Sequence, residues 1–358
     1  MRNIVVLLLI ASCFLVACSS ESEVKIKKPN KLASYKVEET FEVGKNVFVR
    51  SLVVDQNENA LWVGTSVGAL KIDLVTREVL ATYTRDNGLA NEYVFASAVD
   101  SQKSVWLGTN GGGVSQLTAK GWKTYFPMHG LADYWVYSFV DEPGKAMWIG
   151  TWAGLSRFDY KTKTFTTYLK ELVNEWVYGL DIDSKGQLWV GTEGGINMFD
   201  GNSWQVWTHK DGLGAPNTQN LEFSINTGLG TRSRHDLSVL QGGRDTFNPN
   251  YIFCINISDD DKVWAGTWGG GVSFYNGTRW KNLTESDGLA GNIVYSMDVT
   301  GKDKWFGTNR GVSRFDGENW FTLSKSDGLL DSHVYALARD PSGGVWVGTR
   351  NGVALVSL

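Results

Sequence analysis

The chain is poor in cysteine, with only Cys13, Cys18 and Cys254 among its 358 residues. A disulfide framework needs pairs of cysteines, and we expect Cys13 to be removed with an N-terminal leader and Cys18 to be modified, so no disulfide is predicted. Cys254 lies within the apolar run Tyr251–Ile255. We therefore predict that Cys254 is a small buried residue.

Positive charge is not in excess: 34 Lys and Arg stand against 38 Asp and Glu, for a formal net charge of −4. No basic stripe stands out, so nucleic acid is not expected as a partner. The four histidines are scattered, and the sequence contains neither His-Glu-x-x-His nor Cys-x-x-Cys. We therefore predict no metal site, no cofactor and no catalytic residue, although enzymatic activity stays open.

Only one long apolar run occurs, Ile4–Val16, and it is shorter than the about 20 residues that a membrane-spanning helix needs. Arg2 precedes it, which is typical of a secretory signal. The segment Leu15-Val16-Ala17-Cys18 that ends it resembles the lipobox of bacterial lipoproteins. That resemblance implies a signal peptide over 1–17, a lipid on Cys18 and membrane attachment by the lipid anchor only. An ordinary cleaved signal is the alternative. The polar residues 18–34 are predicted to be a flexible tether.

Tryptophan and glycine are abundant, with 16 Trp and 41 Gly. The tetrapeptide Trp-x-Gly-Thr recurs seven times, at Trp62, Trp106, Trp148, Trp189, Trp264, Trp305 and Trp346. Each copy follows a short run that opens with Val or Ile and an aromatic residue, which we align as Val47-Phe48, Val94-Phe95, Val136-Tyr137, Val177-Tyr178, Ile252-Phe253, Val294-Tyr295 and Val334-Tyr335. Four such runs per unit, separated by Gly and Asp turns, predict a four-stranded antiparallel sheet.

Repeats of this length that cannot bury both faces alone predict an all-β, seven-bladed β-propeller over residues 35–358. The last unit lacks a fourth strand, and the stretch Tyr35–Phe41 ahead of the first unit can supply it, which would close the ring. One interval between repeats is 34 residues longer than the usual 41. We interpret residues 214–250 as an insertion, with a degenerate eighth blade as the alternative.

The segments Leu188–Gly195, Gly311–Asp316 and Asp327-Gly328-Leu329 resemble the two-component regulator propeller repeat. The resemblance recurs through residues 35–358. It implies a periplasmic, seven-bladed sensor domain of the kind joined to histidine kinases, some of which recognise oligosaccharides. Because this chain ends at Leu358 without a kinase segment, we expect any signal to pass through another protein.

Four tryptophans are not explained by the repeat or by the fourth strands. Trp135 and Trp176 precede the Val that opens a unit, and Trp152 and Trp268 follow the Thr of Trp-x-Gly-Thr. In a propeller both positions lie on one face of the ring, near the central channel. We predict a ligand-binding site there, formed by Tyr93, Trp135, Trp152, Trp176, Glu193, Tyr251, Trp268, Arg310, His333 and Arg350. Packing of these aromatic residues against the blade ends is the alternative.

These features favour a non-catalytic propeller lipoprotein outside the cytoplasm, in the periplasm or at the outer membrane, that binds a small molecule, an oligosaccharide or an envelope protein. Two alternatives stay open. One is a propeller lyase or hydrolase that uses His333, Glu193, Arg310 and Arg350, and the other is a structural scaffold in an envelope complex. The insertion also carries a basic cluster of Arg232, Arg234, His235 and Arg244, which would meet an anion or be solvated.

Overall fold

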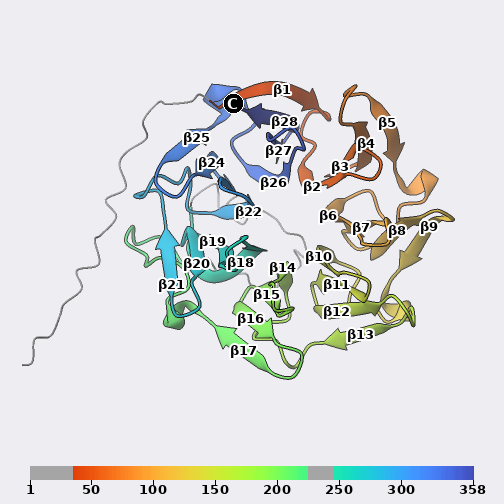
Figure 1. Cartoon of the computed structure of the whole chain (residues 1–358), viewed down its shortest axis with the longest axis horizontal. Coiled ribbons are helices and arrows are strands. Elements are labelled where there is room, and N and C mark those ends of the chain that lie inside the picture. The colour runs from red at the N-terminus through yellow and green to blue at the C-terminus, as the bar shows by residue number, and fades with distance from the viewer. Residues whose placement is uncertain (1–34, 225–244) are drawn as a thin grey trace, which may run out of the picture.

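The computed structural model describes residues 35–224 and 245–358, which form seven four-stranded antiparallel sheets arranged around a central axis (Figure 1). The prediction of a seven-bladed all-β propeller is confirmed, and the described part of 214–250 contributes no eighth sheet. The predicted signal peptide, tether and lipidated Cys18, and the basic cluster of the insertion, lie outside the described residues. No helix within the described ranges is long and apolar enough to cross a membrane.

Each blade runs from an inner strand at the axis to an outer strand at the rim. The first four blades are β2 (Val49–Asp55), β3 (Ala60–Thr65), β4 (Gly68–Asp73), β5 (Val79–Tyr83); β6 (Val94–Val99), β7 (Val105–Thr109), β8 (Val114–Thr118), β9 (Gly121–Tyr125); β10 (Val136–Glu142), β11 (Ala146–Thr151), β12 (Gly154–Asp159), β13 (Phe165–Tyr168); and β14 (Val177–Ile182), β15 (Leu188–Thr192), β16 (Gly195–Phe199), β17 (Trp204–Trp207). The last three are β18 (Asn248–Ile257), β19 (Val263–Trp268), β20 (Val272–Tyr275), β21 (Trp280–Leu283); β22 (Val294–Asp298), β23 (Lys304–Thr308), β24 (Gly311–Phe315), β25 (Trp320–Leu323); and β26 (Val334–Arg339), β27 (Val345–Thr349), β28 (Gly352–Ser357), β1 (Lys36–Glu42).

The ring is closed by its two ends. Strand β1 pairs with β28 from Lys36 opposite Ser357 to Glu42 opposite Gly352, as the sequence predicted. The inner strands of neighbouring blades contact one another around the whole circle, including β2 with β26. Closure covers the edge of β28 and gives the last blade the same four strands as the others.

The three defined residues of Trp-x-Gly-Thr each have a separate role in packing. All seven Trp side chains are buried. The Thr hydroxyl donates to the carbonyl of a turn glycine in every blade, as from Thr65 to Gly68 at 2.7 Å. A Cβ on Gly64 would lie 2.8 Å from Cγ1 of Val94 in the next blade. The motif therefore joins each blade to its successor.

Apart from the one after blade 4, which carries the insertion, connections between blades are short as well. Four contain a single turn of 3-10 helix, namely η1 (Arg85–Asn87), η2 (Pro127–His129), η3 (His209–Asp211) and η4 (Lys325–Asp327). In the Asp-Gly-Leu segment that follows blade 4, Asp211 accepts a hydrogen bond from the Thr208 amide at 2.8 Å. Gly212 takes a left-handed φ of 96°, and the Leu213 side chain is buried. This segment is therefore a helical turn with a buried apolar anchor.

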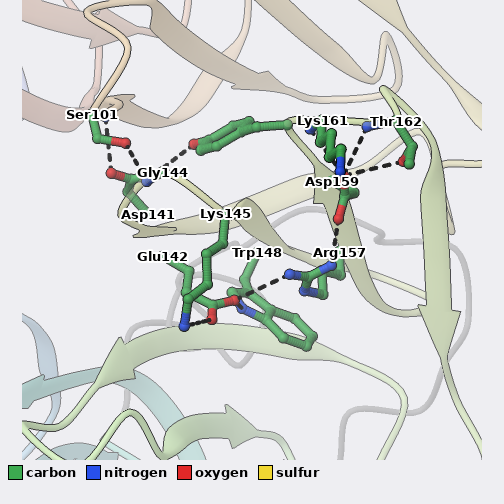
Figure 2. A network of polar contacts seen from close by, with 11 residues as sticks. Ser101, Asp141, Glu142, Gly144, Lys145, Trp148, Arg157, Asp159, Lys161 and Thr162 are labelled. Atoms are coloured by element: carbon green, nitrogen blue, oxygen red, sulfur yellow. Dashed lines mark hydrogen bonds and ion pairs between the residues drawn. The ribbon is translucent and has the colours of Figure 1, made fainter.

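Polar contacts also link neighbouring blades at the ends of their strands, as Figure 2 shows for blades 2 and 3. Asp141 accepts hydrogen bonds from the Ser101 amide at 2.9 Å and from the Tyr160 hydroxyl at 2.6 Å. Within blade 3, Glu142 accepts a bond from the indole N–H of Trp148 at 3.2 Å. The buried Trp of the repeat thereby has its polar atom satisfied.

Candidate functional site

Six aromatic side chains form a nearly complete ring around the propeller axis. Each follows the Val or Ile that pairs with the Thr of Trp-x-Gly-Thr, and they are Phe95, Tyr137, Tyr178, Phe253, Tyr295 and Tyr335. Consecutive members of this axial ring are in contact, with centroids 5.3, 5.0, 6.0, 5.5 and 5.1 Å apart in that order. Edge and tilted ring contacts of this kind stabilise the cluster beyond the burial of area.

A β-bulge in each inner strand directs these side chains. The register shifts between Val94 and Ala96, for example, which leaves Phe95 without a partner opposite it, and the same shift occurs at the matching place in all seven inner strands. Bulges re-aim a single side chain out of the strand's alternation. The side-chain spacing in the sequence carries no signal for this feature.

The seventh place in the ring is taken by an arginine. Val49 pairs with Thr65 just as Val94 pairs with Thr109, so Arg50 stands where the other blades have an aromatic residue. The alignment of Val47-Phe48 with the other openings is therefore wrong. The spacing in the sequence could have revealed this. Val47 lies 15 residues before Trp62 and Val49 lies 13 before it, whereas the other openings lie 11 or 12 residues before their Trp.

The centre of the propeller is hollow. A small cavity at the axial ring is lined by Arg50 together with Phe95, Phe253, Tyr295 and Tyr335. A second space of about 630 Å³, open to solvent, shares those residues and continues along the inner strands past small residues such as Ser51 and Ala96. The axial ring thus forms one end of a central channel.

The predicted aromatic residues do gather beside this ring. Trp135 and Trp152 are adjacent because the Trp152 amide donates to the Trp135 carbonyl at 3.0 Å. The indole of Trp152 in turn stacks on Trp176 of the next blade, with centroids 4.2 Å apart and planes at 22°. Tyr93, Tyr251 and Trp268 belong to the same cluster. The two sequence positions therefore meet in space, as expected for one face of the ring.

These aromatic residues differ in exposure. Trp152, Tyr251 and Trp268 are buried, and the Trp268 indole N–H donates to the Thr246 hydroxyl at 2.8 Å. Trp135, Trp176 and Tyr93 remain partly exposed. The latter three are therefore the members of this set of six that solvent reaches, and Trp152 packs against one of them, Trp176.

The predicted polar residues are held by different partners. Arg310 forms ion pairs with Asp245 and Glu285, and the Arg350 guanidinium donates to the side-chain oxygen of Asn46. Glu193 is buried at the end of β15. Arg310 lies on blade 6 and Arg350 on blade 7, and these contacts do not bring the two arginines into one site.

His333 interacts with a neighbouring carboxylate. Its Nδ1 lies 3.1 Å from Oδ1 of Asp331, and its amide donates to the same oxygen at 3.0 Å. Burial alone would raise the pKa of Asp331, but these hydrogen bonds from His333 outweigh it and lower the pKa below its usual value. Asp331 is therefore ionised at neutral pH and orients the imidazole. Among the described residues, no group of three His, Cys, Asp or Glu side chains could hold a metal ion.

The base of the insertion contributes a pocket of its own. A space of about 550 Å³ lies between residues 215–221 and the loop after β21, with Phe247 in its wall and Asn217, Gln219, Glu285 and Asn292 among its polar lining. Sequence reasoning missed this pocket because its two sides are far apart in the chain. No motif marks either side.

Comparison with known families identifies the repeat. A family model described as two component regulator propeller matches residues 171–194 and 328–351. The chain is thus a β-propeller in which two segments match the two component regulator propeller repeat that the motifs resemble. No curated protein matches the chain.

Solved structures share the fold at low sequence identity. The extracellular domain of BT3049 from B. thetaiotaomicron, described as a hybrid two component system, is 20% identical with a TM-score of 0.69, and the match covers 87% of this chain but 39% of that one. Virginiamycin B lyase from Staphylococcus aureus is 13% identical with a TM-score of 0.65, covering 91% and 100%. The WD40 repeats of RRP9 are 15% identical with a TM-score of 0.64, covering 93% and 100%. These likenesses concern the fold.

Proposed function

We propose that this protein is a ligand-recognition propeller that acts outside the cytoplasm, is anchored by a lipid on Cys18 and binds its ligand at the aromatic end of the central channel. The repeat type supports a sensory role, since the similar BT3049 domain is extracellular and belongs to a two component system. The N-terminal pattern Leu15–Cys18 supports the lipid anchor.

The observation that carries the proposal is the stacked pair Trp152 and Trp176 on the axial cluster. Trp152 is buried whereas Trp176 and Trp135 are partly exposed, so the stacked pair offers an apolar platform beside the axial ring. Grouped, partly exposed aromatic faces mark interaction sites. Flat amphipathic ligands such as sugars stack on such faces and direct their hydroxyls to polar groups.

Intrinsic tryptophan fluorescence tests this site. A panel of oligosaccharides should include at least one that changes the emission of the full chain, and Trp176→Ala should weaken its binding roughly tenfold through loss of a stacking face. Trp204→Phe on the outer strand β17 is the matched control and should bind normally. Binding that is unchanged in Trp176→Ala would remove the site.

The lyase or hydrolase alternative concerns the same end of the propeller. It requires His333 to act on a bound molecule, and His333→Ala would then abolish turnover while binding persists. The scaffold alternative requires that neither Trp135→Ala nor Trp176→Ala alters any ligand measurement. Turnover and ligand binding measured in these three variants distinguish the two alternatives.

A further inference from the structure

The central arginine is the most unusual group of the channel. Arg50 is only 8% exposed, yet no carboxylate in the described part of the chain forms an ion pair with it. Its Nε donates to the Tyr93 hydroxyl at 3.2 Å, and no acceptor among the described residues serves Nη1 or Nη2. Burial of an unpaired charge costs free energy.

Aromatic faces compensate part of that cost. The guanidinium carbon of Arg50 lies 4.2 Å from the centroid of Tyr335 and 4.8 Å from that of Phe48. Cation–π contacts of this kind stabilise the buried guanidinium and do not use its N–H donors. An aromatic residue occupies this place in the six other blades, so the fold does not need a charge here. The arginine therefore calls for a role beyond packing.

The cavity walls define what the arginine can meet. Arg50 is the single charged residue among those that line the two axial cavities, and most of the others are aromatic or small. Arg350, whose guanidinium lies 5.6 Å from the centroid of Phe48, adds positive potential from the rim. The site thus combines the buried guanidinium of Arg50 with its N–H donors, a positive potential and aromatic walls.

We propose that Arg50 forms an anion site on the propeller axis that takes the carboxylate of a ligand with a flat ring. The proposal deepens, and rests on, ligand binding at the aromatic end of the channel. A planar guanidinium with both Nη donors available matches a carboxylate, which accepts two parallel hydrogen bonds. The aromatic walls contact the ring that carries the carboxylate, whether it is a sugar acid or an aromatic acid.

Two pairs of probes distinguish a sugar acid from an aromatic acid, with binding to the full chain measured by calorimetry or ligand-observed NMR. D-glucuronate is compared with D-glucose, and benzoate with benzyl alcohol. At least one acid should bind ten times more tightly than its neutral partner, and the pair that shows the preference identifies the ring. Arg50→Met should abolish the preference, because the charge and both donors are lost. Arg85→Gln, at an exposed arginine of η1, should retain it.

Two further variants keep the test sound if Arg50→Met does not fold. Arg50→Lys keeps the charge but loses the planar fork, so the acid should bind at least about fivefold more weakly. Tyr93→Phe removes only the hydroxyl that positions Nε and should weaken binding of the acid. Equal binding of acid and neutral probes, or no binding of either acid, overturns the anion site. Trp176-dependent binding of a neutral oligosaccharide alongside that result would leave the broader proposed function intact.

Discussion

At the scale of single residues, the repeat motif is explained by three different physical demands. The Trp fills the space between blades, the Thr closes a turn through its hydroxyl, and the Gly permits the close approach of the next inner strand. Each demand is local and is met again in every blade. For that reason the motif is readable in the sequence without knowledge of the fold.

The glycine demand leads to a stability prediction. In Gly64→Ala the new Cβ would lie 2.2 Å from Oγ of Ser51 and 2.8 Å from Cγ1 of Val94, so the Ser51 hydroxyl must rotate and Val94 must move. We expect a loss of about 1–3 kcal/mol in the free energy of unfolding. Denaturant titration measures it. Gly144→Ala, where no atom lies within 4 Å, should lose less because only its left-handed backbone opposes the change. An equal loss in both variants would contradict the packing argument.

Arg50 shows the limit of reading residue by residue. The pair Val47-Phe48 matched the pattern of apolar and aromatic residues, but the strand pairing places Val49 opposite Thr65. A charged residue in an aromatic position is not visible to a search for similar residues. The spacing to Trp62 favours Val49 over Val47, and the register of the strands shows which side chain faces the axis.

At the scale of elements, the contribution of β1 to the last blade is the feature that the sequence predicted most directly. An orphan strand ahead of the first unit and a missing strand in the last one implied the pairing, which β1 and β28 confirm. Tyr35 adds to it, since its ring packs on Trp305 at 5.2 Å and its hydroxyl donates to Asp303 at 3.0 Å. The closing strand is therefore held by both backbone and side-chain contacts.

Removal of this strand should open the ring. A chain that begins after Glu42 loses the partner of β28 and exposes a sheet edge, so we expect its Tm to fall by at least about 5 °C. Thermal denaturation followed by circular dichroism measures the change. A chain that begins at Tyr35 is the control and should retain the Tm of the full propeller. An equal Tm in the two truncated chains would show that β1 does not close the ring.

The bulges of the inner strands are the opposite case. They determine that Phe95 and its equivalents point to the axis, but a bulge depends on pairing between strands and has no fixed composition. The sequence therefore predicted the strands and their order without predicting which side chains line the channel.

At the scale of the whole molecule, the proposed anchor sets where the channel operates. Residues 1–34 precede the first strand, and the predicted lipid on Cys18 would tether the propeller to a membrane surface. Each buried CH₂ of an acyl chain contributes about 0.8 kcal/mol to membrane binding, so several chains on one cysteine suffice without a spanning helix.

Metabolic labelling tests the anchor. In a bacterium that processes lipoproteins, the full chain should incorporate labelled palmitate and sediment with membranes, whereas Cys18→Ser should be unlabelled and soluble. Cys13→Ser should behave as the parent chain, because Cys13 lies within the predicted signal. Labelling that survives in Cys18→Ser, or a parent chain that takes up no label, would refute the anchor.

The sequence by itself determined the number of blades, the four strands in each, the closing strand and the face on which the surplus tryptophans lie. These follow from contacts within one repeat or between equivalent places in successive repeats, so they recur in the sequence with a period. The tertiary structure alone decided that Arg50 completes the axial ring, that Trp152 and Trp268 are buried while Trp176 is partly exposed, and that Arg310 pairs with Asp245 and Glu285. Those outcomes depend on strand register and on side chains from separate blades or loops that converge near the axis, and no local pattern encodes such meetings.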